Sequence, residues 1–226
     1  MRKLIFLSIF LLWLIQGQAA ITLIAPTPTG SYSPSANPRV SPSLTTATGD
    51  YLIVLACSDQ SGWTVTGVTD SQTTPNTYIQ AVDQAGTGSR HCSIWYGIAG
   101  NNATYTISVT FTGAGQSYVA WIQARGVVGG FQVATSGTTN SVSITTTQSN
   151  ELLVGAFMNY PVPTVGGCCT SILSELHNDG VLFEYSLTNT AGANAINASG
   201  AFLAVAAAFK PNAASTPARR RTEVIQ

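Results

Sequence analysis

The sequence predicts an all-β protein: an antiparallel β-sandwich of jelly-roll-like design with about a dozen strands. Apolar and polar residues alternate with a period of two through most of the chain from residue 21 to residue 209. Clusters of turn-forming residues, among them "GNNAT", "TGAGQS", "SGTTNS" and "NTAGAN", separate the alternating segments at short intervals. No segment in this region has the period of a convincing amphipathic helix.

The alternation is clearest in residues 104–112, "TYTISVTFT". In a strand, the apolar side chains would share one face, and these are Tyr105, Ile107, Val109 and Phe111. The threonines and Ser108 would share the other face, whereas a helix would scatter both sets around its axis. Residues 141–147, "SVSITTT", repeat the pattern more weakly. Both segments are therefore predicted to be strands with one buried face.

Two other segments, "YLIVLAC" (51–57) and "LLVGAFM" (152–158), are apolar at every position and are predicted to be central strands covered on both faces. Each follows a turn residue and an acid, "GD" in the first case and "NE" in the second. Further along, "SIWYGIAG" and "SYVAWIQARGV" are echoed by "LFEYSLTN" and "AFLAVAAAFKP". The repetition predicts a divergent internal duplication, with two copies of one antiparallel unit interleaved or packed face to face.

The N-terminal residues 1–19 are typical of a signal peptide. Two basic residues precede the apolar run 4–15, and Gly17 and Ala19 occupy the small-residue positions of a cleavage site. The run is shorter than the roughly 20 residues of a membrane span, although an uncleaved N-terminal anchor is the alternative. Residues 20–211 are then predicted to form a single β-sandwich domain, and 212–226 a flexible basic tail. A secreted location, extracellular or periplasmic, follows from this interpretation.

Charge excludes one class of partner. Nine basic and nine acidic residues give a net charge of zero, and only 8% of all residues are charged. Nucleic acid is therefore not expected as a partner, because nothing attracts a polyanion. Low charge and threonine-rich strands instead favour self-association. The one basic cluster, "RRR" in the tail, could touch an anionic cell-envelope surface.

At the level of whole motifs, the chain resembles a β-sandwich module of uncharacterised secreted bacterial proteins. The resemblance rests on "GDYLIVLAC", "GVTDSQTTPNTY", "SIWYGIAGNNATYTISVTF", "VAWIQARGV", "NELLVGAF" and "AVAAAFKP", which cover most of residues 45–211. Gln123 departs from the pattern, since an acid usually stands there. The resemblance implies a fold and an exported location, and it implies no activity.

Four cysteines in an exported chain are expected to pair, with three connectivities open. A bridge between Cys57 and Cys92 would close a loop of about 35 residues and contribute roughly 3–4 kcal/mol. Cys168 and Cys169 are neighbours, so they would bridge each other or each reach one of the first two. The favoured arrangement is 57–92 with 168–169. No histidine lies at zinc spacing from them.

The motifs of common hydrolases and nucleotide-binding proteins are absent, and His91 is predicted to be a surface residue. The stretch "SELHNDGVLFEY" predicts a hairpin with a two-residue Asp179-Gly180 turn. That register places Glu175, His177 and Glu184 on one face, with the two glutamates opposite each other. Such a group could bind calcium or a transition metal, could act as an acid/base pair, or could simply be solvated. Calcium could also bind at Asp70, which otherwise forms a turn with Asn76.

Three tryptophans form the second candidate site. The alternation assigns each of them, Trp63, Trp95 and Trp121, to the polar face of its segment. Trp121 shares that face with Gln123 and Arg125. Exposed tryptophans on a sandwich can stack on sugar rings, whereas a covering sheet or loop would bury them. The candidate ligand-binding residues are therefore Trp63, Trp95, Trp121 and Arg125.

The first interpretation is a secreted, non-enzymatic binding or adhesion module with a glycan as ligand and no cofactor other than calcium. The alternatives are a structural subunit or decoration of an extracellular assembly, and a hydrolase that uses a metal or the carboxylate pair.

Overall fold

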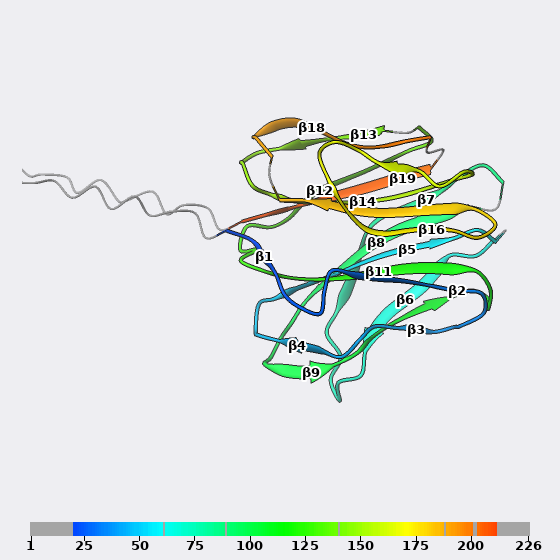
Figure 1. The fold of residues 1–226 in the computed structure, drawn as a ribbon. Coiled ribbons are helices and arrows are strands. Elements are labelled where there is room, and N and C mark those ends of the chain that lie inside the picture. Colours follow the sequence, from blue (N-terminus) through cyan, green and yellow to red (C-terminus); the bar gives the residue numbers. More distant parts are fainter. Residues whose placement is uncertain are drawn as a thin grey trace, which may run out of the picture.

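The computed structural model describes residues 20–60, 62–88, 90–139, 141–187, 189–200 and 203–211. Its regular structure in these ranges is nineteen β-strands in antiparallel sheets (Figure 1), which confirms the predicted all-β sandwich. The count exceeds a dozen because strands as short as two residues carry no alternation that a sequence could reveal. None of these residues forms a helix able to cross a membrane. The predicted signal peptide and basic tail lie outside the described residues.

The first half of the chain forms one large sheet and two small ones. The large sheet has the order β1-β11-β5-β8-β7, and β2 also pairs with β11. Its strands are β1 (Thr22–Leu23), β2 (Thr29–Ser33), β5 (Tyr51–Ser58), β7 (Tyr78–Ala85), β8 (His91–Ile98) and β11 (Ser117–Arg125). The small sheets are β3-β10-β6 and β4-β9, formed by β3 (Arg39–Val40), β4 (Leu44–Thr46), β6 (Val65–Asp70), β9 (Ala103–Tyr105) and β10 (Ile107–Phe111).

The second half repeats this plan. Its large sheet has the order β12-β19-β14-β17-β16, and its small sheet the order β13-β18-β15. The strands are β12 (Gly130–Gly137), β13 (Ser141–Thr146), β14 (Leu152–Asn159), β15 (Thr164–Val165), β16 (Thr170–Leu176), β17 (Gly180–Ser186), β18 (Gly192–Ser199) and β19 (Leu203–Lys210). In each half the last long strand, β11 or β19, lies between the strand that opens the half, β1 or β12, and the buried central strand, β5 or β14. Other strands, among them β10 and β18, belong to the small sheets. This is the strand order of a jelly roll, so the predicted repeat is present in the structure.

The two large sheets pack face to face, and the small sheets cover their outer faces, which gives four layers (Figure 1). The strand orders of the two large sheets run in opposite directions across the stack, because β7 lies against β12 and β19 at one edge while β16 lies against β2 at the other. The central core contains Ile53, Leu55 and Ile122 from the first half with Val154, Phe183 and Val205 from the second. The halves therefore share their largest apolar core.

The repeated "GD" and "NE" motifs have one structural explanation. Gly49 and Asn150 both adopt positive φ, at 89° and 58°, a conformation that glycine and asparagine tolerate best. The acid that follows is buried in both halves. Asp50 accepts a hydrogen bond from the amide of Ala47 at 2.9 Å, and Glu151 accepts two from the preceding turn at 3.0 Å each. Each acid thus satisfies backbone donors where the chain enters its central strand.

The strands β5 and β14 that follow these acids are buried at every position, as their sequences predict. The Cys57–Cys92 disulfide is also confirmed and joins directly opposite residues of β5 and β8. The second disulfide links Cys168 with Cys169, the arrangement that the sequence favours. Two disulfides are typical of a protein that folds in an oxidising compartment.

Candidate functional site: a tryptophan-lined pocket beside the seam of the two halves

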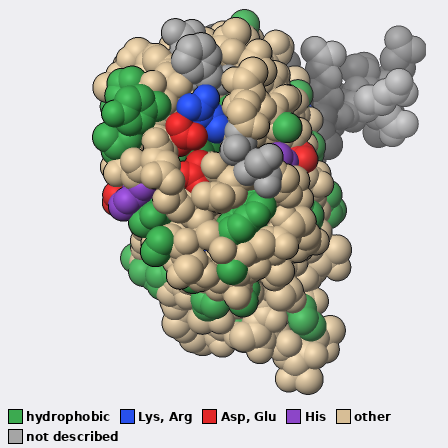
Figure 2. Space-filling view, turned by 90° about the vertical axis from the view of Figure 1, so that its right-hand side faces the viewer, with side chains coloured by type: hydrophobic (Ala, Val, Ile, Leu, Met, Phe, Trp, Pro, Cys, Tyr) green, Lys and Arg blue, Asp and Glu red, His purple; other side chains and the backbone are tan. Residues whose placement is uncertain are grey.

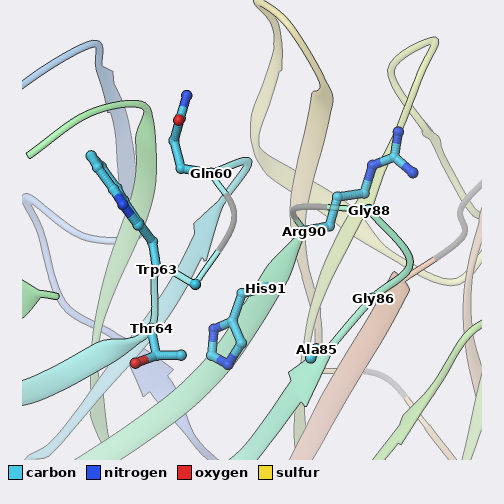
Figure 3. A pocket seen from close by; sticks show the side chains of 9 residues that line it. Gln60, Trp63, Thr64, Ala85, Gly86, Gly88, Arg90 and His91 are labelled. Carbon is cyan, nitrogen blue, oxygen red and sulfur yellow. The ribbon is translucent and has the colours of Figure 1, made fainter. Parts of the chain in front are cut away.

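A small pocket lies between the β5–β6 and β7–β8 loops (Figure 3). It is a hollow of about 120 Å³. Its lining residues are Gln60, Gly62, Trp63, Thr64, Ala85, Gly86, Gly88, Arg90 and His91. Figure 3 shows Trp63 and Arg90 on opposite sides with His91 between them. The pocket thus combines an aromatic surface with polar side chains.

Trp63 is held in place by its own loop and by two glycines. Its amide donates to the carbonyl of Gln60 at 3.1 Å, and its carbonyl accepts from the Ser58 hydroxyl at 2.8 Å. A Cβ at Gly113 would lie 2.5 Å from the indole, and one at Gly115 only 2.2 Å from it. Only glycine lets the backbone approach the ring this closely. Since Trp63 stays half-buried, part of the ring remains accessible in the pocket.

His91 is buried, which corrects the prediction of a surface position. Its exposed fraction is 7%, and its Nε2 lies 3.0 Å from Oδ1 of Asp83. The reason is the place of β8 in the sheet: His91 pairs with Ser58 of β5 on one side and with Ala85 of β7 on the other. A residue flanked by strands on both sides has little access to solvent.

Arg90 connects the pocket to the second half of the molecule. Its Nε and Nη2 donate to the two carboxylate oxygens of Asp179 at 3.0 and 2.6 Å, a bidentate ion pair with both side chains less than one-fifth exposed. The carbonyl of Asp179 accepts from the Tyr118 hydroxyl at 2.9 Å. Arg90 and Asp179 therefore fasten the β7–β8 loop to the β16–β17 loop across the seam.

A second acid, Asp59, lies beside this ion pair. It is 8% exposed, and neither carboxylate oxygen has a hydrogen bond of full geometry to any described residue. Burial raises the pKa of Asp59, and the nearby charge of Asp179 raises it further, although the backbone amides of both residues and His177 act in the opposite direction. On the face drawn in Figure 2, acidic, basic and histidine side chains gather in one zone, and the lower part of the face is nearly free of charge.

The predicted Glu175, His177 and Glu184 group is not formed. The hairpin has a three-residue loop, with Leu176 opposite Gly180 and Glu175 opposite Val181, and a bulge follows farther along β16. The tight two-residue turn is therefore wrong. The change of register separates the two glutamates, because Glu175 now shares its side of the hairpin with Val181. Glu184 stays on the face opposite Val181 and Phe183, and it is 0% exposed because the small sheet and the loop of the two cysteines cover that face.

The other two members of that group remain near the surface. His177 Nε2 lies 3.6 Å from Glu175 Oε2, and both side chains are more than one-third exposed. The imidazole also stacks on Tyr32 of β2, with ring centroids 3.3 Å apart. The contact places His177 at the seam between the halves and gives it a packing partner.

Of the three tryptophans, Trp121 does not reach solvent as predicted, and Trp95 is only partly exposed. Trp121 is 1% exposed, and Trp95 is half-buried with its Nε1 donating to Ser93 Oγ at 3.1 Å. Both side chains lie on the face of the large sheet that points away from the central core, but the small sheets cover that face. Arg125 extends past the cover, and its Nε and Nη2 bind Asp50 at 2.7 and 2.8 Å. Arg125 therefore has a structural partner, and Trp63 is the predicted tryptophan that lines a pocket.

Asp70 forms the turn that the sequence indicates. Its carboxylate accepts from the amide of Gln72, from both nitrogens of Asn76 and from the Tyr78 hydroxyl, at 2.8–3.2 Å. These donors occupy the oxygens that a calcium ion would need.

Sequence reasoning missed Asp59, Asp83 and Asp179 as partners in this region. No local pattern could have found them, since each meets residues from another loop or strand. Comparison of the chain with protein families, with curated proteins and with solved structures gives no match. The structure shows an all-β protein with several antiparallel sheets.

Proposed function

We propose that the protein is a secreted, non-enzymatic binding module that holds a sugar unit in the Trp63 pocket. The observation that carries the proposal is the indole of Trp63, which rests on Gly113 and Gly115 at one side of the hollow. The apolar face of a pyranose stacks on such a ring, and neighbouring polar groups bind its hydroxyls. Gln60 is the polar side chain of the lining that lies beside Trp63 (Figure 3), whereas the Arg90 guanidinium is engaged by Asp179.

The size of the pocket limits the ligand. Its volume of about 120 Å³ is well below the roughly 300–1,000 Å³ of pockets that enclose drug-sized molecules. A single terminal or protruding sugar unit therefore suits it better than a buried oligosaccharide. Binding is favoured over glycoside hydrolysis because the described lining contains no Asp or Glu, whereas glycosidases use a pair of carboxyl side chains. The apolar N-terminal segment and the disulfides support a secreted location.

A glycan array followed by titration calorimetry tests the proposal. We expect the protein to bind one class of glycan, and we expect W63A to weaken that binding about 10-fold or more, which corresponds to roughly 1.4 kcal/mol of stacking energy. W63F should retain part of the affinity because it keeps an aromatic face. Trp95→Phe, a change of the same kind outside the pocket, is the matched control. Unchanged glycan binding by W63A would contradict the proposal.

A structural role in an extracellular assembly is the second candidate. The strands β7 and β16 end the two large sheets, and each exposes an apolar side chain: Ile79 is 51% exposed and Leu176 is 48% exposed. Edge strands of this kind pair readily with a second copy. Light scattering over a range of concentrations should then show association that I79K and L176K both reduce. A monomer at every concentration contradicts this role.

A further inference from the structure

The strongest unexplained feature outside the pocket is the buried carboxyl of Glu184. It lies in the middle of β17, between Gly155 of β14 and Ser171 of β16, and is 0% exposed. Neither oxygen makes a hydrogen bond of full geometry within the described ranges, although the amide of Gly166 is close enough to favour the charged form. A buried acid without a counter-charge costs several kcal/mol or stays protonated.

The two adjacent cysteines lie next to this carboxyl. Cys168 and Cys169 belong to the loop between β15 and β16, and their Sγ atoms and a Glu184 oxygen all lie within 4.8 Å of one another. Cys168 is exposed, whereas Cys169 packs against the outer core of the second half. The three groups therefore form a cluster with one side open to solvent and the other closed by the sheet.

The chemistry of this cluster depends on its oxidation state. Disulfide sulfurs are poor ligands, whereas two thiolates and one carboxylate are a donor set that suits zinc and excludes calcium or magnesium, which prefer oxygen. Three protein ligands leave the fourth tetrahedral position for water. Two thiolates on one zinc lie about 3.8 Å apart, given Zn–S bonds of about 2.3 Å. Gly167 precedes the cysteines with open space around it and gives the loop backbone freedom to make this adjustment.

We propose that Cys168, Cys169 and Glu184 form a redox-gated site for a divalent transition metal, with zinc as the best fit. Two molecules of a small thiol, or one dithiol, supply two electrons and two protons, so that the Cys168–Cys169 bond opens to two thiols and the reductant becomes a disulfide. Metal binding then releases the two thiol protons, and that of Glu184 where it is protonated. The metal supplies the counter-charge that the carboxyl lacks in the oxidised state. This inference is independent of the sugar-binding proposal.

Burial of the other disulfide makes reduction selective for the Cys168–Cys169 bond. Cys57 and Cys92 are at most 1% exposed and lie inside the central core. A thiol reagent reaches the exposed Cys168 first, because disulfide exchange needs access to a sulfur. Mild reduction is therefore expected to free two thiols and to leave the Cys57–Cys92 bridge intact.

The test uses cobalt(II) as a spectroscopic probe. The purified protein is reduced anaerobically with a limiting amount of dithiothreitol, the thiols are counted, and cobalt(II) is titrated in before zinc displaces it. We expect a thiolate-to-cobalt charge-transfer band in the reduced protein and none in the oxidised protein or in C168S/C169S. E184Q should weaken metal affinity by at least about 10-fold, since even outer-shell partners commonly cost 10- to 100-fold. E175Q, which changes an exposed glutamate elsewhere on the hairpin, is the matched control. Circular dichroism confirms that each variant is folded.

Two results would overturn the proposal. One is a reduced, folded protein that develops no charge-transfer band with cobalt(II). The other is an E184Q variant that binds cobalt(II) and zinc as tightly as the wild type, which would show that the carboxyl is no ligand.

Discussion

The two halves share one strand order but differ in how they fill their outer cores. In the first half, Trp95 and Trp121 flank Val54 in the middle of the large sheet. In the second half, Glu184 and Ala206 flank Gly155 at the equivalent positions. Two indoles thus correspond to a carboxyl and a methyl group. The jelly-roll backbone therefore accommodates either set of side chains. Only the second half, with the smaller side chains, has room for a buried acid beneath the cysteine loop.

The acids at the start of the central strands differ in a related way. Asp50 binds Arg125 and Gln123 as well as the turn backbone. Burial by itself would raise the pKa of Asp50, but these hydrogen bonds together lower it. At the equivalent places of β19 the second half has Ala208 and Lys210, and Glu151 has no ion pair to a described residue. The first half therefore fixes its acid with side chains, and the second half with backbone amides.

The largest effect should come from removing an indole of the first half. Trp121→Ala empties a fully buried site and should lower the free energy of unfolding by about 3–5 kcal/mol in urea denaturation. Trp121→Phe should cost much less, because Nε1 of Trp121 donates no hydrogen bond to a described residue. Ala206→Gly, the matched change in the second half, should cost only about 1 kcal/mol. A loss at Trp121 no larger than that at Ala206 would show that the aromatic filling is not what supports the first half.

The second effect is a dependence of stability on pH that originates in the second half. Burial raises the pKa of Glu184 from 4.5 to about 7. In the oxidised, metal-free protein, the unfolded chain therefore loses this proton near pH 4.5 while the folded chain retains it, so stability falls as the pH rises from 4.5 to 7 and then levels off. The total is on the order of 3 kcal/mol.

Thermal melts of E184Q between pH 4 and 8 measure this effect. The variant should lose most of the slope and should melt higher than the wild type above pH 7. A smaller slope of the same sign should remain, because the pKa of Asp59 is also raised. E175Q, which alters an exposed carboxylate, should follow the wild-type curve. Identical curves for E184Q and the wild type would contradict the assignment.

The smallest effect is the difference in stability between variants of Asp50 and of Glu151, the acids at the start of the central strands. Asp50→Ala leaves Gln123 and the amide of Ala47 without their acceptor and should cost about 2–3 kcal/mol. Glu151→Ala removes two hydrogen bonds to backbone amides and should cost about 1 kcal/mol, as the loss of a helix cap does. Urea denaturation of the two variants gives both values. Equal losses would mean that Arg125 and Gln123 add nothing to the first half.

The sequence by itself determined the strands and the repeat, and it favoured the Cys57–Cys92 pair among three connectivities. These features depend on local order: alternation selects a strand, an unbroken apolar run selects a central one, and the positive-φ residues Gly49 and Asn150 mark where each run begins. The same alternation along the strands showed that Trp95 and Trp121 point away from the central core. It could not show whether that outer face meets water or a covering sheet.

Only the tertiary structure decided which groups are buried and which ones meet. A one-residue change in the loop before Gly180 separated Glu175 from Glu184, because the register decides which side chains of two paired strands share a face. The face of β17 that carries Glu184 is buried beneath the small sheet, and the alternation within β17 cannot show that cover. The Asp179 contact of Arg90 joins loops 89 residues apart in the chain. Such contacts depend on how the two large sheets stack, and no local pattern encodes that stacking.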